Sequence, residues 1–561
     1  MEQTRARPSA RAGLDFLGSQ AAKIGEPWLV LVPLLLVEWI AEIVFALSVR
    51  HNGFVFYQGG DQIWYYTTGW LVGHGLIPKT LISPAWSFLL APLALVIGPG
   101  YVSALPAAIL IEALVLGPIA LFCVYDIASR IAGRMIGYVA AGLWVIGPYV
   151  AIPLFKQAYH VKYVDEFLPH PLGLTMMGDF PSVVCLLAAA ALIVRTYQAR
   201  RVELAIAAGL VTGLAVLTKA SNLIFLATPV VLFLIGRRWR ELGTFALAVL
   251  PALAALTLWK YRGYGSLPAF GNGYAPERLA LGPGASVPVA SILTPYHKYA
   301  NIDWSHLQNN LDGLGEVFFS LRVLQFLPFA GAIAVARRSW ALAAALSVWF
   351  WLYFVIKGSD AVSSVDSGSF FRLLMPAIPP LVIMVACLPV LVPRFGVTLA
   401  QRFPAPVPRV PGRRMLIAAA VVLGLVPLVA SAALQPIHGG SRALVMSDIA
   451  VPVDPGLDLR ATVRDGAVLL RWNEPASGIA NVFYRVRGFP GSRDYFCNTS
   501  GGASSCYYQG IRRLRTRETH AVIHPGRGTW TFRVTAGANW LNDPLMGDQF
   551  LVSNPVVVTV R

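Results

Sequence analysis

The chain has 561 residues, of which 56% are hydrophobic and only 13% are charged. Soluble domains carry about 25% charged residues, so this composition excludes a soluble globular protein. The formal net charge of +17 would suit a nucleic-acid-binding protein, but the arginines fall in short clusters between apolar stretches. That distribution follows the positive-inside rule of multi-pass membrane proteins, and it excludes nucleic acid as the partner.

Residues 27–49 form the first apolar segment, and the polar residues 1–26 before it lack the cleavage site of a secretory signal. We expect this segment to stay as an anchor, with residues 1–26 in the cytoplasm. Further apolar stretches alternate with basic clusters. If all clusters are cytoplasmic, the sequence predicts about eleven membrane-spanning helices in a transmembrane domain covering 27–434, and several of them reach the roughly 20 residues that cross a bilayer. They are expected at residues 27–49, 103–126, 135–155, 179–195, 203–218, 220–236, 241–258, 318–336, 340–357, 372–392 and 415–434.

This topology predicts a protein of the plasma (inner) membrane with a cytoplasmic amino terminus and an extracytoplasmic carboxyl terminus. The outer face then carries the loops 50–102, 156–178 and 259–317. Residues 84–98 are apolar but short, and a full span there would invert every later loop, so we expect a helix lying in the outer interface. Seven of the eight lysines fall on the outer side. They favour an anionic ligand there, although solvated lysines would also explain most of them.

Residues 435–561 follow a different pattern, in which alternating residues predict strands at 468–472, 481–489, 529–537 and 556–560. We expect an all-β sandwich on the outer face. Trp472, Tyr484 and Trp530 resemble the core aromatic residues of a fibronectin type III domain, which more often binds or spaces than catalyses. The nearby Cys497 and Cys506 would form a disulfide in an oxidising compartment, whereas the other three cysteines lie inside apolar spans.

Four charged residues at the outer ends of spans are candidates for chemistry. Asp61 lies among aromatic residues in the first outer loop, and Asp179 opens a span; a solvated loop charge and a helix cap are the simpler explanations. Lys219 and Arg372 lie at the outer interface, where they could meet a lipid phosphate. Snorkelling would also place a lysine there.

Other polar residues support weaker hypotheses. Acids inside spans are functional hypotheses by default, and a structural pair facing the bundle is the alternative for Glu38, Glu42 and Glu112. Residues that would contact an acceptor or line a cavity are Gln62, Tyr65, His74, Asp165 and Glu166. For Asp165 and Glu166, the alternative interpretation is that they are solvated loop acids.

Four segments in this order resemble the GT-C glycosyltransferases, including the protein O-mannosyltransferases and the lipid A aminoarabinose transferases. They are Asp61 with the following WYYTTGWLVGHG, MGDFPS around Asp179, GLVTGLAVLTK ending at Lys219, and FRLLMPAIPPL beginning at Phe371. Two positions depart from the family pattern. Gln62 stands where the mannosyltransferases carry a second acid, and Leu373 stands in place of a tyrosine.

The resemblance implies a GT-C-like fold and an inverting transfer of one sugar, hexose or pentose, from a polyprenyl-phosphate donor on the outer face. It implies Asp61 as the general base and Lys219 and Arg372 as the groups that bind the lipid phosphate. Asp179 would position the acceptor, orient a cation or help to hold a metal. A divalent metal is the one cofactor that the resemblance leaves open, because the oligosaccharyltransferase branch depends on one.

The expected partners are membrane lipid, the polyprenyl-phosphate sugar and a glycan, glycolipid or protein acceptor of the cell envelope. Two other classes of function stay open. A transporter or flippase for a lipid-linked saccharide would explain the acids inside spans, although no internal repeat of the kind found in transporters is evident. An envelope scaffold or receptor would act through the β domain, and removal of residues 445–561 would then abolish its function.

Overall fold

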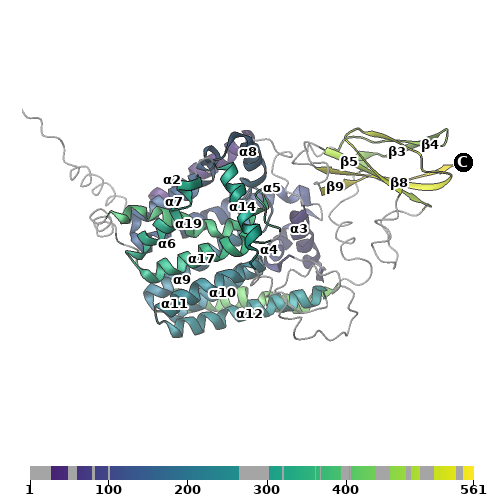
Figure 1. Cartoon of the computed structure of the whole chain (residues 1–561). Coiled ribbons are helices and arrows are strands. Elements are labelled where there is room, and N and C mark those ends of the chain that lie inside the picture. The colour runs from purple at the N-terminus through teal and green to yellow at the C-terminus, as the bar shows by residue number, and fades with distance from the viewer. Residues whose placement is uncertain are drawn as a thin grey trace, which may run out of the picture.

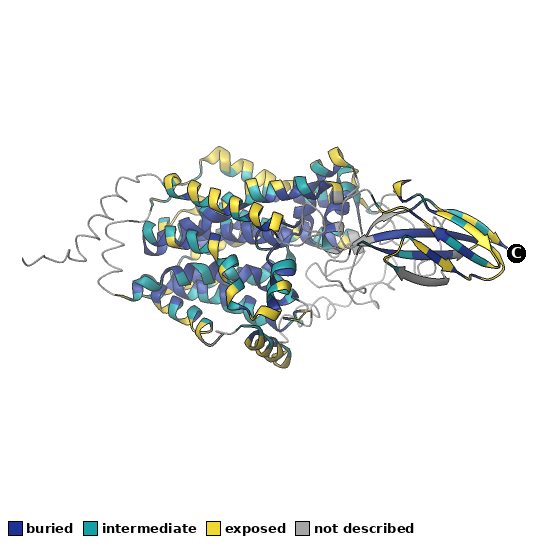
Figure 2. Ribbon diagram, turned by 90° about the horizontal axis from the view of Figure 1, so that it is seen from above, coloured by how far each residue is buried: buried dark blue, intermediate teal, exposed yellow. Residues whose placement is uncertain are grey.

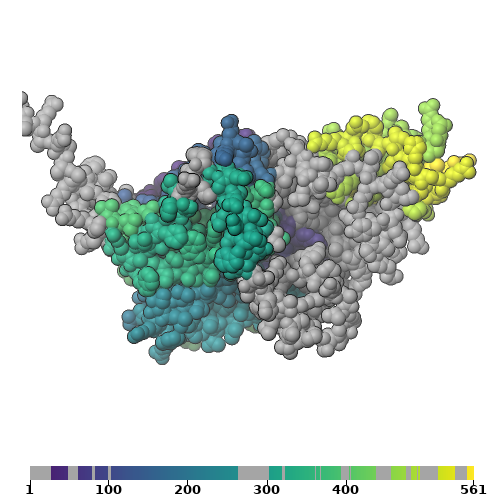
Figure 3. Space-filling model, viewed as in Figure 1, coloured from purple at the N-terminus to yellow at the C-terminus, as the bar shows by residue number. Residues whose placement is uncertain are grey.

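The computed structural model describes the chain in two regions, one helical and one made of strands (Figure 1). Figure 3 shows the C-terminal strands, in yellow, at one end of the molecule and the helices at the other. The described residues are 27–48, 60–78, 82–98, 101–264, 302–318, 321–360, 362–366, 368–392, 404, 406–436, 455–475, 482–492, 511–538 and 548–561.

Seven helices in the described part of the chain are long and apolar enough to cross a membrane. Three of them contain irregular turns: Ser103–Ala132, Ser369–Ala386 and Arg413–Ala433. The elements are α2 (Trp28–Ser48), α5 (Tyr101–Ile111) with η1 (Glu112–Leu116) and α6 (Gly117–Ala132), α9 (Asp179–Ala199), α12 (Trp239–Tyr264), α17 (Trp340–Gly358), α18 (Ser369–Leu374) with η6 (Met375–Ala377) and α19 (Ile378–Ala386), and α21 (Arg413–Ala419) with η8 (Ala420–Leu425) and α22 (Val426–Ala433).

Shorter helices connect and flank these seven. They are α3 (Gly60–Gly73), α4 (Pro84–Ile97), α7 (Arg134–Val150), η2 (Ile152–Leu154), α8 (Gln157–Lys162), η3 (Tyr163–Phe167), α10 (Val202–Thr218), η4 (Ala220–Leu226), α11 (Ala227–Ile235), α14 (Trp304–Val317), α15 (Leu321–Leu324), α16 (Leu327–Ala336) and η7 (Leu388–Leu391).

A helix lies at every position where the sequence predicts a span, but several are shorter than expected. The predicted span 318–336 contains two helices, because the chain turns before Pro328 at the start of α16. The predicted span 220–236 begins as the 3₁₀ turn η4 and only then continues as α11. The chain crosses the membrane as a helical protein, whereas the number of crossings and the orientation of the termini stay predictions. Residues 84–97 form a helix, and its place in the interface also stays a prediction.

In the α9–α10 hairpin the two helices pack against each other, with α6 against α9 and α12 against α10 (Figure 1). Two glycines on α10 allow the close approach of α12. A Cβ at Gly209 would lie 2.5 Å from the carbonyl oxygen of Phe245, and one at Gly213 would lie 2.6 Å from Cβ of Ala252. The sequence predicts this packing role for both glycines.

The periphery of the helical region is apolar and exposed (Figure 2). Helix α2 shows this most clearly, since Leu29, Ile40 and Leu47 are 63%, 61% and 74% exposed. A soluble protein rarely exposes so continuous an apolar surface, and lipid tails would cover it. The face of α2 that turns inward carries Glu38 and Glu42, both buried.

An ion-pair network joins helices at one end of this region. Nε of Arg130 and Nε of Arg195 each lie 2.9 Å from Oδ2 of Asp126. Arg130 also donates to the carbonyl oxygen of Pro406, at 3.0 Å. These arginines belong to the clusters that the sequence assigns to the cytoplasm. They lie at the carboxyl end of α9, and Asp179 lies at its amino end.

The strands of the C-terminal region form two antiparallel sheets. One has the order β10-β8-β5-β6, with β9 also paired to β8, and the other has the order β3-β4-β7. The strands are β3 (Arg460–Arg464), β4 (Ala467–Arg471), β5 (Val482–Pro490), β6 (Ile511–Thr516), β7 (His520–Ile523), β8 (Gly528–Ala538), β9 (Asp548–Val552) and β10 (Val556–Val560).

Both sheets contribute side chains to a shared apolar interior that includes Trp472, Tyr484 and Trp530. The ring of Trp472 meets that of Tyr484 edge-on, with centroids 5.4 Å apart. The four predicted strands correspond to β4, β5, β8 and β10. The fibronectin type III assignment stays a prediction, and Cys497 and Cys506 lie outside the described residues. A short parallel pair, β1 (Leu76–Ile77) with β2 (Gln435–Pro436), ties the end of α22 to the segment after α3.

Candidate functional site

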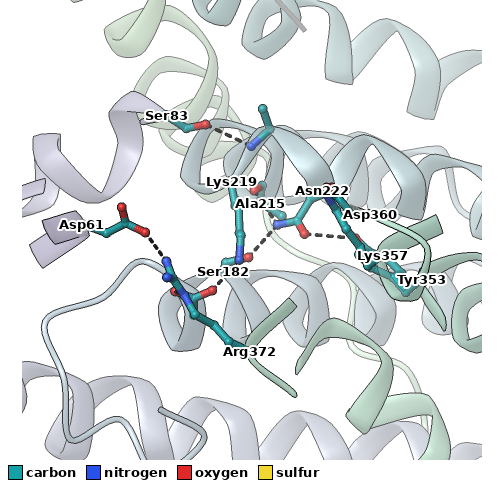
Figure 4. Close-up of polar contacts among 12 residues, drawn as sticks. Asp61, Ser83, Ser182, Ala215, Lys219, Asn222, Tyr353, Lys357, Asp360 and Arg372 are labelled. Atoms are coloured by element: carbon teal, nitrogen blue, oxygen red, sulfur yellow. Dashed lines mark hydrogen bonds and ion pairs between the residues drawn. The ribbon is translucent and has the colours of Figure 1, made fainter. Parts of the chain in front are cut away.

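Four charged side chains form a continuous ion-pair chain at one end of the helical region (Figure 4). The guanidinium of Arg372 contacts the carboxylates of both Asp61 and Asp179, with its Nε 3.1 Å from Oδ2 of Asp179. The ammonium group of Lys219 pairs with the other oxygen of Asp179. We call this set, Asp61–Arg372–Asp179–Lys219, the four-residue network. It lies at the end of the bundle that the sequence predicts to face outward.

The four members differ in their exposure to solvent. The side chain of Asp179 is only 3% exposed, whereas those of Lys219, Arg372 and Asp61 are 19%, 29% and 43% exposed. The buried carboxylate of Asp179 therefore contacts both cations, Lys219 and Arg372, from the buried side of the network. Asp61 closes the network from the open side, and its formal charge balances the set at two acids and two bases.

Asp179 occupies the first position of α9. Gly178 precedes it, and a Cβ at this glycine would lie 2.6 Å from Cζ of Tyr65. Only glycine therefore lets the buried Tyr65 ring approach the start of α9. Pro181 fits the first turn of the helix, where its missing N–H costs nothing. The hydrogen bonds of its carboxylate go to Lys219 and Arg372, while its negative charge still suits the dipole at the start of the helix.

Lys219 follows the last residue of α10, where the chain becomes extended with φ −149° and ψ 113°. Asn222 fixes this break in the helix. Its amide donates to the carbonyl oxygen of Ala215 at 2.8 Å and to Oγ of Ser182 at 2.7 Å. The hydroxyl of Tyr353 donates to Oδ1 of Asn222 at 3.0 Å. Asn222 is fully buried and joins α9, α10 and α17 directly behind the lysine (Figure 4).

Arg372 lies on the short helix α18, and the loop before that helix is anchored to α14. The buried Asn310 donates to the carbonyl oxygens of Gly358 and Ser363 at 2.9 and 3.0 Å, and it accepts from the amide of Val365 at 3.1 Å. Gly368, at φ +74°, then lies directly against the ring of Phe167. These contacts attach the described residues of the loop to α14 and to Phe167, next to the start of the helix that carries Arg372.

Asp61 is the second residue of α3, which packs along α4. Oγ of Ser83, just before α4, accepts from the amide of Ala220 at 2.9 Å. Trp86 on α4 donates to the carbonyl oxygen of Met176 at 3.3 Å. Hydrogen bonds at α4, which packs against the helix of Asp61, therefore reach both the segment after Lys219 and the loop before Asp179.

The other residues that the sequence singles out fall into two groups. Tyr65 lies close to Asp61, Asp179 and Arg372, and burial with the two carboxylates raises its pKa. Gln62 beside Asp61 is fully buried. His74 lies thirteen residues further along the chain than Asp61, about 20 Å along the helix axis. It stacks on Trp70, and the structure does not bring it to the network.

Asp165 and Glu166 lie on η3. Glu166 is 3% exposed, and burial raises its pKa to about 8. The solvated-acid reading of Glu166 is therefore wrong. Neither residue has an ion pair with the four-residue network in the described part of the chain.

Sequence reasoning missed His170, which lies nine residues before Asp179. Its ring is 5% exposed, and the charges of all four network residues act on it. Burial and the nearby Arg372 lower its pKa to about 4. The available signal was its place between Pro169 and Pro171, in a loop already assigned to the same side as the other four.

The residues as placed do not fit a divalent metal. Among the described residues, no group of three or more His, Cys, Asp or Glu side chains could hold an ion. Calcium and magnesium require several converging oxygens, whereas Asp61 and Asp179 face cations. No step proposed below therefore runs through a metal.

Comparison with known proteins gives no family. No family model and no curated protein matches the chain. Two solved structures of the Archaeoglobus fulgidus oligosaccharyltransferase are similar at 16% identity. The form tethered to an acceptor peptide with the NVT sequon has a TM-score of 0.43, over 74% of this chain and 57% of that chain. The apo form has a TM-score of 0.41, over 73% and 57%.

The chain thus spans a little over half the length of these oligosaccharyltransferase structures. TM-scores below 0.5 at this identity support no inference about activity, and the function must be argued from the geometry of the network.

Proposed function

We propose that the protein is a GT-C-type glycosyltransferase. It would move one sugar from a polyprenyl-phosphate donor to a hydroxyl of an envelope glycan, glycolipid or protein on the outer face of the membrane. The observation that carries this proposal is the four-residue network, in which one exposed carboxylate and two cations meet at one end of a membrane-embedded bundle. A base and a phosphate-binding pair are the two parts that this reaction needs.

The cations would bind the phosphate of the donor. Arg372 offers a planar fork that matches phosphate oxygens, and Lys219 offers a point charge. As the bond between the anomeric carbon and the phosphate oxygen breaks, that oxygen keeps the electron pair and gains negative charge. Preformed cations offset this charge in the transition state. Asp179, bound to both, would keep them oriented toward the phosphate.

Asp61 would act as the general base. The acceptor oxygen attacks the anomeric carbon from the face opposite to the phosphate, so the configuration inverts, and the proton of the acceptor passes to the carboxylate. Before the donor binds, Arg372 neutralises Asp61. Binding of the phosphate would draw the guanidinium away, and Asp61 would then be free to accept the proton. Such catalysis contributes about 10²–10⁴ in rate.

The test is release of polyprenyl phosphate from a panel of hexosyl and pentosyl polyprenyl phosphates by the full chain in detergent, with a cell-envelope extract supplied as the hydroxyl acceptor. We expect Asp61→Asn to lower turnover by about 10²–10⁴ at equal folded yield. Asp312→Asn, at an exposed position on α14, is the matched control and should keep wild-type turnover. If Asp61→Asn keeps wild-type turnover, the assignment of the base is wrong.

A lipid-linked saccharide transporter or flippase is the second candidate, and the buried acids Glu38, Glu42 and Glu112 favour it. The two functions separate in sealed vesicles that contain a fluorescent polyprenyl-phosphate sugar. A transporter would move the intact lipid between leaflets without cleaving it, whereas a transferase would release the sugar from its phosphate.

A further inference from the structure

His170 lies in the loop between η3 and α9, and the backbone holds it firmly. Its amide donates to the carbonyl oxygen of Phe167 at 3.0 Å, and its own carbonyl oxygen accepts from the amide of Gly173 at 3.2 Å. The flanking Leu174 amide donates to Pro169 at 2.9 Å. The ring is therefore fixed in place by the loop rather than by hydrogen bonds of its own.

Nδ1 of this ring is buried and has no hydrogen-bond partner among the described residues. Most buried side-chain polar atoms in folded proteins have a partner, and one left without it costs free energy. A partner supplied by a substrate would remove that cost. Nδ1 is therefore available to a ligand that carries a hydrogen-bonding group.

The charges around the ring indicate which ligand this is. Arg372 from α18 acts most strongly on it, followed by Asp179 of α9, Lys219 after α10 and, least, Asp61 of α3. The proposed base, Asp61, thus acts on the ring least of the four. At neutral pH it is uncharged, since its pKa is about 4, so it carries one N–H donor and one acceptor nitrogen.

We propose that Nδ1–H of His170 donates a hydrogen bond to the phosphate of the polyprenyl donor, beside Arg372 and Lys219. This inference rests on the proposed function, and it adds a neutral donor to the two cations. A neutral group can satisfy a phosphate oxygen without adding a third positive charge to a site that holds only two carboxylates. His170 is then a binding residue for the lipid phosphate and takes no proton from the acceptor.

The test uses farnesyl phosphate as a short prenyl phosphate, with farnesol and inorganic phosphate as controls, and measures binding to the full chain in detergent. His170→Asn keeps an amide nitrogen near the position of Nδ1, whereas His170→Gln places it near Nε2. We expect His170→Ala and His170→Gln to weaken farnesyl phosphate binding about ten-fold or more. His170→Asn should stay within about three-fold of wild type. Farnesol binding should be unchanged in all variants.

Two results would overturn the inference alone: wild-type affinity for farnesyl phosphate in His170→Ala, or equal losses in the Asn and Gln variants with a lowered melting temperature. The second pattern means a structural role. If inorganic phosphate binds as tightly as farnesyl phosphate, the assignment to a lipid phosphate fails. If wild-type protein binds farnesyl phosphate no better than farnesol, the phosphate-binding role of Lys219 and Arg372 fails as well, and the proposed function falls with it.

Discussion

Asp179 opens helix α9 and Lys219 follows the end of helix α10, and their side chains form an ion pair at the same end of this hairpin. The pair is a direct consequence of two antiparallel neighbours with acid and base at matching ends. Arg372 then reaches the second oxygen of the same carboxylate from a helix 193 residues away in the sequence. One buried acid therefore sets the position of both cations.

This arrangement predicts that Asp179 and Lys219 are energetically coupled. Asp179→Asn leaves two cations without their buried counter-charge, so it should destabilise the protein. Lys219→Met should destabilise it less, because Arg372 still pairs with the carboxylate. The double variant should show a coupling energy of about 0.5–3 kcal/mol in a double-mutant cycle, measured by denaturant unfolding in detergent.

The pair Lys357–Asp360, whose nitrogen and oxygen lie 3.2 Å apart, is the matched control. Lys357→Met combined with Asp179→Asn should be additive within about 0.5 kcal/mol if the two pairs are independent. Additivity of Asp179→Asn with Lys219→Met would contradict the ion pair as a stabilising contact.

A second prediction concerns Asn222, which makes three side-chain hydrogen bonds behind Lys219. Asn222→Ala removes all three, including the bond that Oδ1 of Asn222 accepts from the Tyr353 hydroxyl. We expect a loss of about 1–3 kcal/mol in the free energy of unfolding. Turnover should fall at saturating donor as well, because the extended backbone that orients Lys219 loses the hydrogen bonds of Asn222.

The matched control for Asn222 is Asn309→Ala, at an exposed position on α14. It should leave both stability and turnover within error of wild type. A stable Asn222→Ala protein with full turnover would show that the extended conformation of Lys219 does not depend on this side chain.

The four network residues could be selected from the sequence because each is a charge at the end of an apolar segment, and the basic clusters place all four on one side. Their contacts could not be predicted. Asp61 and Arg372 are 311 residues apart, and no local pattern encodes which helix ends meet. His170 and Asn222 escaped notice for a related reason: a single polar residue shows no periodicity, and its burial arises only from packing.

The strands show the same limit. The alternating apolar residues of β4, β5, β8 and β10 predict strands, and these four are present. The sequence does not predict β3 and β6, because RATVR and IRRLRT are rich in arginine and each contains only two apolar residues. Pairing with β4 and β5 stabilises these strands, and that pairing depends on the tertiary structure.

A third prediction is a pH dependence of stability that arises from Glu166. Burial raises the pKa of this carboxyl from 4.5 to about 8. Between these values the folded state keeps a proton that the unfolded state has lost, so the free energy of unfolding falls as pH rises through this window. Glu166→Gln cannot ionise and should lose less stability between pH 5 and pH 8.

The measurement is the change in melting temperature between pH 5 and pH 8, compared between wild type and Glu166→Gln in detergent. Asp165→Asn, one residue earlier and only half-buried, is the control and should follow the wild-type slope. Equal slopes for wild type and Glu166→Gln would mean that this carboxyl ionises in the folded protein without cost.

The last prediction concerns Glu112, in the π-helical turn η1 within the span Ser103–Ala132. The residue is fully buried, and neither carboxyl oxygen has a hydrogen-bond partner among the described residues. The charges that act on it are those of Asp179 and Glu42, which are also acids. Nothing described here offsets a negative charge at this position, so the carboxyl costs stability. Irregular helical turns of this kind often lie at functional sites.

If the Glu112 carboxyl lowers stability and has no role in the reaction, Glu112→Met should raise the free energy of unfolding by about 1–3 kcal/mol and keep donor turnover. Glu203→Met, at an exposed acid at the start of α10, is the control and should change stability by less than about 0.5 kcal/mol. A lowered melting temperature for Glu112→Met would show that the carboxyl has a stabilising partner. Raised stability with loss of lipid movement in the vesicle assay would instead favour the transporter, because a costly acid would then be kept for transport.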